Sequence, residues 1–338
     1  MRGQGRIISV IAWLALAGVA GAEEAKPVRV TVGNFIRAET DYYFGTRPFG
    51  QLQHSRDMAP IERQDVVRMN RDTLYSSGVF DLDAGAVTIA LPDAGRRFMS
   101  MQVISQDHYT TAVVYGPGRF AYDRDSVGTR YVFVLVRTLA NAEDPADLKA
   151  ANAVQDAIKV EQAAVGRFTV PNWDKESQDK VRAALNQLAP LRGDDPGAMF
   201  GSRNQVDPVA HLIGTAIGWG GNPRDAAVYD STYPASNDGR TMHRLTVRDV
   251  PVDGFWSISL YNAQGFFEKN HRNAYSLNNV TAKPDPDGAF TIQFGGCEKR
   301  TPNCLPIMAG WNYTVRLYRP RPEIIDGGWK FPEAQPVR

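Results

Sequence analysis

Cysteine is scarce in this chain, and neither sign of charge is in excess. The 338 residues include 2 Cys, which excludes a disulfide-rich scaffold but permits one disulfide. Lys and Arg together number 38 and Asp and Glu 37, so the formal charge is +1. Without a broad basic surface the chain lacks the main source of affinity for nucleic acid, and we expect no such partner.

Long apolar runs are also scarce, and the longest, residues 7–19, is shorter than the about 20 residues that a membrane-spanning helix needs. Arg2 and Arg6 precede this run, and the small residues Ala20-Gly21-Ala22 follow it. The pattern predicts a signal peptide over residues 1–22, cleaved after Ala22, rather than a membrane anchor. We therefore expect a periplasmic or secreted protein without a membrane span, and its 36 basic and 37 acidic residues would give a formal charge of −1.

The remaining chain has ample material for a core, with 15 Phe, 13 Tyr and 6 Trp. Short β-type runs separated by turn residues occupy residues 28–137 and 241–332, and residues 144–218 have helical periodicity. Asn34 is placed to cap a helix that Gly45 ends. Further helices are expected from Pro145 to Gly166, over 174–188, and from Pro208 to about Trp219. The predicted fold is mainly β with a helical insert (α+β), as two antiparallel β-sandwich or jelly-roll-like modules.

The two cysteines, Cys297 and Cys304, lie seven residues apart in a segment rich in turn residues. In an oxidising compartment this spacing favours a disulfide; the alternatives are a metal pair or a catalytic thiol. The 5 His residues lack the spacings of zinc motifs, and the chain has no P-loop and no dinucleotide-binding glycine motif. We expect neither a metal nor a cofactor.

Two segments concentrate hydrogen-bonding side chains. Residues 69–78 hold Asn70, Arg71, Asp72 and Tyr75 just before a β-type run, and residues 262–275 combine amides, a histidine and aromatic rings after another. Such clusters can hold a small polar ligand. They can equally be structural, because Asn and Asp hold turns and an Arg–Asp pair can fasten a corner of a sandwich.

Both segments carry a family resemblance. The string Asn70-Arg71-Asp72-Thr73-Leu74-Tyr75 and the residues that follow it resemble the bacterial domain of unknown function 1254. The last third, with Trp256, Tyr261, Asn270, Tyr275 and the string Arg316-Leu317-Tyr318-Arg319-Pro320, resembles the domain of unknown function 1214. The resemblance implies two packed β modules in an exported protein and allows for a homo-oligomer. It implies no established reaction.

Three hypotheses follow for function. The first is an exported enzyme, of hydrolase or isomerase type, that acts on a small molecule with Asp72 or His108 as acid/base and Arg71 and Tyr75 orienting the substrate. The second is a periplasmic binding protein without turnover, and the third is a structural or assembly protein of the envelope. The residues expected to bind the small molecule in the first two are Asn70, Arg71, Tyr75, Trp256, Tyr261, Asn270 and Tyr275.

Overall fold

The computed structural model describes residues 26–64, 67–191, 198–298 and 301–337. The predicted signal peptide, residues 1–22, lies outside the described residues. No helix in the described ranges is long and apolar enough to cross a membrane.

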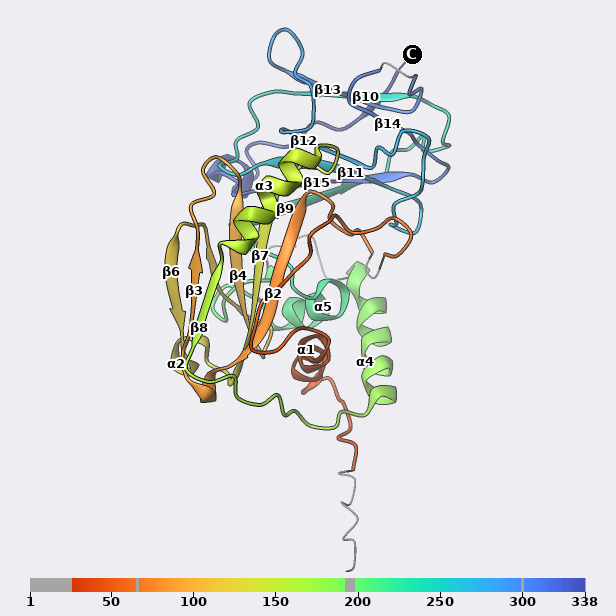
Figure 1. Ribbon diagram of the computed structural model, residues 1–338. Helices are drawn as coiled ribbons and strands as arrows, with labels where there is room; N and C mark the ends of the chain where they lie inside the picture. The colour runs from red at the N-terminus through yellow and green to blue at the C-terminus, as the bar shows by residue number, and fades with distance from the viewer. Residues whose placement is uncertain (1–25, 65–66, 192–197, 299–300, 338) are drawn as a thin grey trace, which may run out of the picture.

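Two antiparallel sheets pack face to face in the first half of the chain (Figure 1). Alternation decides which side chains enter the core between them. In β3, for example, Val87, Ile89 and Leu91 are buried while Thr88 and Ala90 are partly exposed. The larger sheet has the order β1-β2-β7-β4-β5, with bounds Gln53–His54, Thr73–Asp81, Tyr131–Leu139, Met99–Ser105 and Thr110–Val114. The smaller has the order β6-β3-β8, with bounds Gly118–Tyr122, Val87–Leu91 and Lys159–Gln162.

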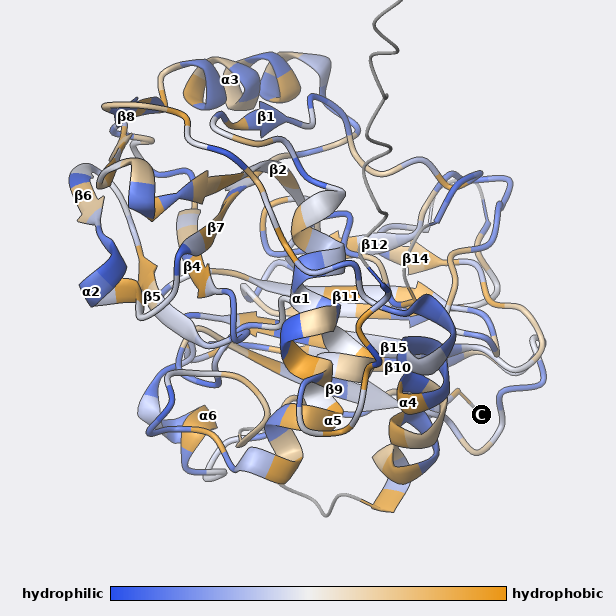
Figure 2. Cartoon of the chain, turned by 90° about the horizontal axis from the view of Figure 1, so that it is seen from below, coloured by the Kyte–Doolittle hydropathy of each residue, from blue (hydrophilic) through white to orange (hydrophobic). Residues whose placement is uncertain are grey.

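A helical layer covers the other face of the larger sheet (Figures 1 and 2). It consists of α1 (Phe35–Gly45), α4 (Lys175–Leu188) and α5 (Pro208–Gly218), which share a core of Phe35, Leu185 and Ile213. Asn34 stands at the expected N-cap of α1, but its side chain makes no cap hydrogen bond. Its Oδ1 accepts instead from the backbone N–H of Thr31, at 2.7 Å, so the predicted cap interaction is wrong.

The helix expected from Pro145 to Gly166 is shorter in the structure. Here α3 spans Pro145–Asp156, and the next residues form β8, which pairs with β3. The alternating segment from Lys159 completes a sheet, and this tertiary pairing outweighs the local helical pattern. The short helices α2 (Arg124–Val127) and α6 (Pro322–Ile325) and the 3₁₀ turns at Leu82–Ala84 and Ala189–Leu191 complete the helical elements of the described residues.

The last third forms a second pair of sheets around its own core, which includes Trp256, Phe294 and Trp311. One sheet has the order β12-β11-β15-β9, with bounds Ser276–Asn278, Trp256–Tyr261, Asn312–Tyr318 and Ala227–Thr232. The other has the order β14-β13-β10-β16, with bounds Cys304–Leu305, Phe290–Phe294, His243–Val247 and Gln335–Pro336. All pairs are antiparallel except β13 with β14. The predicted mainly β, α+β fold is confirmed, as is the disulfide between Cys297 and Cys304.

Candidate functional site

Asp72 immediately precedes β2 and is fully buried. Its Oδ1 accepts a hydrogen bond from Asn278 Nδ2 at 3.2 Å, and its Oδ2 has no partner in the described part of the chain. Burial raises the pKa of the carboxyl group, and the positive charge of Arg316 is the largest opposing influence. Arg71 forms no ion pair with Asp72 among the described residues, so the alternative that these two neighbours fasten a corner of the sandwich has no such contact to support it.

The segment before β2 is fixed against the polar face of β11 and β15. The buried Arg316 guanidinium donates to the hydroxyl of Tyr261 and to the carbonyl of Arg68, both at 2.7 Å. The Tyr261 hydroxyl donates to the Met69 carbonyl at 2.8 Å, and Asn70 Nδ2 donates to the Tyr318 hydroxyl at 3.0 Å. Asn70 and Tyr261 thus join the two β regions.

His108 lies in the helical layer, where α5 covers it. Its Nε2 accepts from the backbone N–H of Gly220 at 2.8 Å, so its Nδ1 carries the proton and donates to Thr215 Oγ1 at 2.8 Å. Burial, followed by the nearby His211, holds the pKa of His108 well below 6.5. Both ring nitrogens are therefore occupied in a neutral side chain, and neither of their partners contacts Asp72.

The His108 ring belongs to a continuous stack. It lies between the rings of His211 and Trp219, with centroids 5.4 Å away on both sides. The stack continues from His211 to Tyr109 at 4.7 Å and from Trp219 to Tyr43 at 4.5 Å. It connects α1 and α5 with the turn between β4 and β5.

Three further predicted ligand residues have structural contacts. Tyr75, in β2, lies beneath the Arg137 guanidinium at 5.9 Å. Trp256 packs between Phe290 and Phe331 in the core of the last third. The side chain of Asn270 holds its own turn, because its Oδ1 accepts from the backbone N–H groups of residues 272 and 274 at 3.1 and 3.2 Å.

Arg71 and Tyr275, one from each predicted polar segment, meet at a cavity of about 590 Å³. The Arg71 guanidinium lies 5.4 Å from the centre of the Tyr275 ring. It is half-buried, and it forms no hydrogen bond or ion pair with another described residue. Burial lowers the pKa of Arg71, and the nearby Tyr275, Glu62 and Asp72 offset this effect only in part. The cavity is lined by Met58, Pro60, Ile61, Glu62, Arg71, Ala142, Glu143, Lys269, Arg272, Asn273 and Tyr275.

The other charges of this Arg71 cavity are largely engaged. Lys269 and Glu62 form an exposed ion pair at 2.6 Å. Arg272 donates to the carbonyl groups of Glu298 and Thr301, the latter at 3.0 Å, within the loop that the disulfide closes. Arg272 and Lys269 were not predicted as site residues, although both lie in the second polar segment. Glu62 and Glu143 carried no local signal, since they come from loops that only the fold brings here.

Comparison with known proteins identifies the two β regions. Residues 49–126 match the family model for a protein of unknown function, DUF1254, and residues 227–322 match that for a protein of unknown function, DUF1214. The chain combines these two domains. No curated protein matches the sequence.

Two solved structures are similar to this DUF1254–DUF1214 chain. The crystal structure of the VPA0106 protein from Vibrio parahaemolyticus has a TM-score of 0.71 at 20% identity, over 91% of this chain and 97% of that one. An uncharacterised protein from Burkholderia cenocepacia has a TM-score of 0.47 at 12% identity, over 86% of this chain and 84% of that one. The first shows that the fold is shared. In the present chain Arg71 comes from the DUF1254 region and Tyr275 from the DUF1214 region, so the Arg71 cavity lies where the two regions meet.

Proposed function

We propose that this protein binds a small molecule bearing one carboxylate in the Arg71 cavity, without converting it. The observation that carries the proposal is the half-buried guanidinium of Arg71, which has an aromatic ring beside it and no hydrogen-bond acceptor among the described residues. A guanidinium presents paired donors that match a carboxylate, and partial burial strengthens this charge-assisted interaction.

The other lining residues favour a monoanion with an apolar body. Met58, Pro60 and Ile61 supply apolar surface on one wall, and Tyr275 supplies an aromatic ring. Of the three cationic side chains at the cavity, Lys269 is paired with Glu62 and Arg272 donates to loop carbonyl groups. Arg71 is therefore the cation left for a ligand, and this favours a single carboxylate over phosphate esters and polycarboxylates. The volume of about 590 Å³ accommodates a ligand the size of a substituted ring.

Calorimetric titration of the purified protein with cyclohexanecarboxylate tests this proposal. Binding should be at least tenfold tighter than that of its neutral methyl ester, and Arg71→Gln should weaken it about tenfold, the effect of losing one charge-assisted contact. Arg96→Gln, at an exposed arginine, makes the same change in net charge and is the matched control. Equal binding by the Arg71 variant, or an equal loss in both variants, contradicts the proposal.

We propose further that the protein is exported. The sequence pattern of residues 1–22 and the disulfide support this, because structural disulfides form mainly in oxidising compartments. Mass spectrometry of the protein recovered from cell envelope extracts should give a chain that begins at Glu23. An intact Met1 in all of the recovered protein contradicts export by cleavage.

The hydrolase or isomerase hypothesis stays a prediction, with Asp72 and His108 as its acid/base residues. For a hydrolase or an isomerase alike, the wild type should turn over a screened substrate, and the Asp72→Asn variant should lose this turnover. The complete burial of Asp72 and the occupied ring nitrogens of His108 are the reason that we place binding first.

A further inference from the structure

The lining of the Arg71 cavity includes one acidic side chain that, like Arg71, is not engaged by the fold. Of the two glutamates in the lining, Glu62 is paired with Lys269. Glu143 forms no ion pair or side-chain hydrogen bond with another described residue. One cation and one anion are therefore left for a ligand, and together they complement a molecule that carries both a carboxylate and an ammonium group.

The turn before α3 holds the Glu143 backbone and leaves its side chain free. Asn141 Oδ1 accepts from the backbone N–H of Glu143 at 3.0 Å, and the backbone N–H of Asn141 donates to Asp147 Oδ2 at 2.7 Å. Asp144 Oδ1 caps α3 by accepting from the backbone N–H of Ala146 at 2.9 Å. The neighbours of Glu143 thus fix the turn with their side chains, and its own carboxylate has no structural task among the described contacts.

An apolar wall connects the two charged ends of the cavity. Ile61 packs against the core cluster that includes Tyr275, the ring beside Arg71. Met58 packs against the core cluster to which α3 contributes, and Glu143 lies just before α3. Ile61 and Met58 both line the cavity, so the short segment that joins them runs from one charged end to the other.

The two free charges are well separated within the cavity. A negative charge raises the pKa of a nearby guanidinium, and Glu62 and Asp72 oppose the effect of burial on Arg71 in this way. Glu143 is not among the charges that do so, which places it farther from the guanidinium than Glu62 is. An α-amino acid carries its two charges around one carbon atom and is poorly matched to such separated partners, whereas a longer chain can contact both.

We propose that the Arg71 cavity binds a zwitterion of the ω-amino acid class. Its carboxylate would bind Arg71, its ammonium group would bind Glu143, and its methylene chain would lie along Met58, Pro60 and Ile61. The reverse orientation would place like charges together at both ends. This inference rests on the carboxylate site proposed above, and it names the second charged group of the ligand.

Calorimetric titration of the purified protein at low ionic strength with 6-aminohexanoate, hexanoate and glycine tests the inference. The wild type should bind 6-aminohexanoate about three- to fivefold more tightly than hexanoate, the ratio expected for one exposed ion pair with Glu143. Glycine lacks the chain and should bind about tenfold more weakly than 6-aminohexanoate. Glu143→Gln should bring the ratio of 6-aminohexanoate to hexanoate affinity to about one. Glu268→Gln, at an exposed position outside the cavity lining, makes the same change in net charge and should keep the wild-type ratio.

Two results overturn the inference. One is equal affinity of the wild type for 6-aminohexanoate and hexanoate, or for 6-aminohexanoate and glycine, comparisons that need no variant to fold. The other is a Glu143→Gln variant that keeps the wild-type preference, or a Glu268→Gln variant that loses as much of it. In these cases cyclohexanecarboxylate binding that depends on Arg71 would show that the carboxylate site itself stands. Cyclohexanecarboxylate binding that is unchanged in Arg71→Gln would overturn both proposals together.

Discussion

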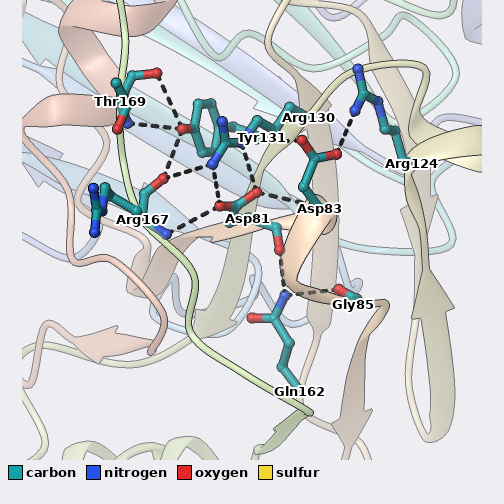
Figure 3. A network of polar contacts seen from close by, with 9 residues as sticks. All are labelled: Asp81, Asp83, Gly85, Arg124, Arg130, Tyr131, Gln162, Arg167 and Thr169. Carbon is teal, nitrogen blue, oxygen red and sulfur yellow. Dashed lines mark hydrogen bonds and ion pairs between the residues drawn. The ribbon is translucent and has the colours of Figure 1, made fainter.

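The carboxylate of Asp81, at the end of β2, accepts four hydrogen bonds and offers the sharpest test of how this fold is stabilised (Figure 3). Its Oδ1 accepts from Arg130 Nε at 2.9 Å and from the backbone N–H of Asp83 at 3.1 Å. Its Oδ2 accepts from Arg130 Nη2 at 2.7 Å and from the backbone N–H of Arg167 at 3.1 Å. The carboxyl is 2% exposed, so water cannot replace these donors.

Asp81→Asn preserves the shape of the side chain but cannot accept all four hydrogen bonds. Whichever way the amide turns, its NH₂ group faces two donors, and the Arg130 charge loses its buried partner. Arg130 is 36% exposed and can be solvated, so the main penalty is that of leaving buried donors and acceptors unmatched, about 1–3 kcal/mol of unfolding free energy. Asp83→Asn is the matched control, because the Asp83 carboxyl accepts from Arg124 at 2.5 Å and lies 3.4 Å from Arg130 Nε but is 36% exposed. This control substitution should lower the unfolding free energy by less than about 1 kcal/mol.

Urea unfolding followed by circular dichroism measures both changes. Hydrogen bonds from Arg130, and then from the two backbone N–H groups, hold the pKa of Asp81 below 3.8. A lowered pKa in the folded state gives stability that is present above pH 3.8 and is lost as the pH falls through the folded value. The difference in unfolding free energy between the wild type and the Asp81→Asn variant should therefore be smaller at pH 3 than at neutral pH. This account would be refuted if Asp81→Asn lowered the unfolding free energy no more than Asp83→Asn does.

Three further predictions concern stability. Gly50→Ala should lower the free energy of unfolding in urea by about 1–3 kcal/mol, because φ at Gly50 is +70° and a Cβ would lie 2.3 Å from Val165 Cγ1. Adding Val165→Ala should recover only the part of this loss that is due to the steric clash. Replacing both Cys297 and Cys304 with Ser should cost about 2–3 kcal/mol in urea unfolding, and no change would contradict the entropic estimate for so short a loop. The low pKa of His108 predicts that stability falls as the pH drops below 6.5, since the unfolded ring binds a proton that the folded ring excludes; His108→Gln should reduce this fall in unfolding titrations at pH 7 and 5.

Local patterns predicted most of the elements that have a clear period. The alternation of residues 87–91 and the proline-led run from Pro208 appear as β3 and α5 with nearly the expected bounds. The end of α3 was not predictable in the same way, because the next segment is a strand only by virtue of its pairing with β3. Two-residue strands such as β1 likewise have no period of their own and depend on their neighbours.

The candidate site likewise combines features that local sequence predicted with features that depend on the packed fold. Sequence grouped Arg71 with Asp72, yet neighbours along an extended chain point in opposite directions, and only the packed fold shows which side is a cavity. Arg71 and Tyr275 lie in separate segments whose meeting depends on the contact of two β regions. The His108 side chain could not be placed from sequence either, since its contacts come from α5 and its backbone has a left-handed φ of +64°.

The five-ring stack through His108 gives the molecule an intrinsic optical probe. Trp219 lies nearly parallel to Tyr43 and to His108, with interplanar angles of 13° and 18°. Rings held in one chiral arrangement give near-ultraviolet circular dichroism, and this signal vanishes when fixed packing is lost even if secondary structure remains. Trp219 contacts α1 and the larger sheet together, so its contribution to this signal, taken as the difference from a Trp219→Phe variant, reports docking of the helices on that sheet. This contribution can therefore separate release of the helical layer from melting of the sheets in a single unfolding experiment.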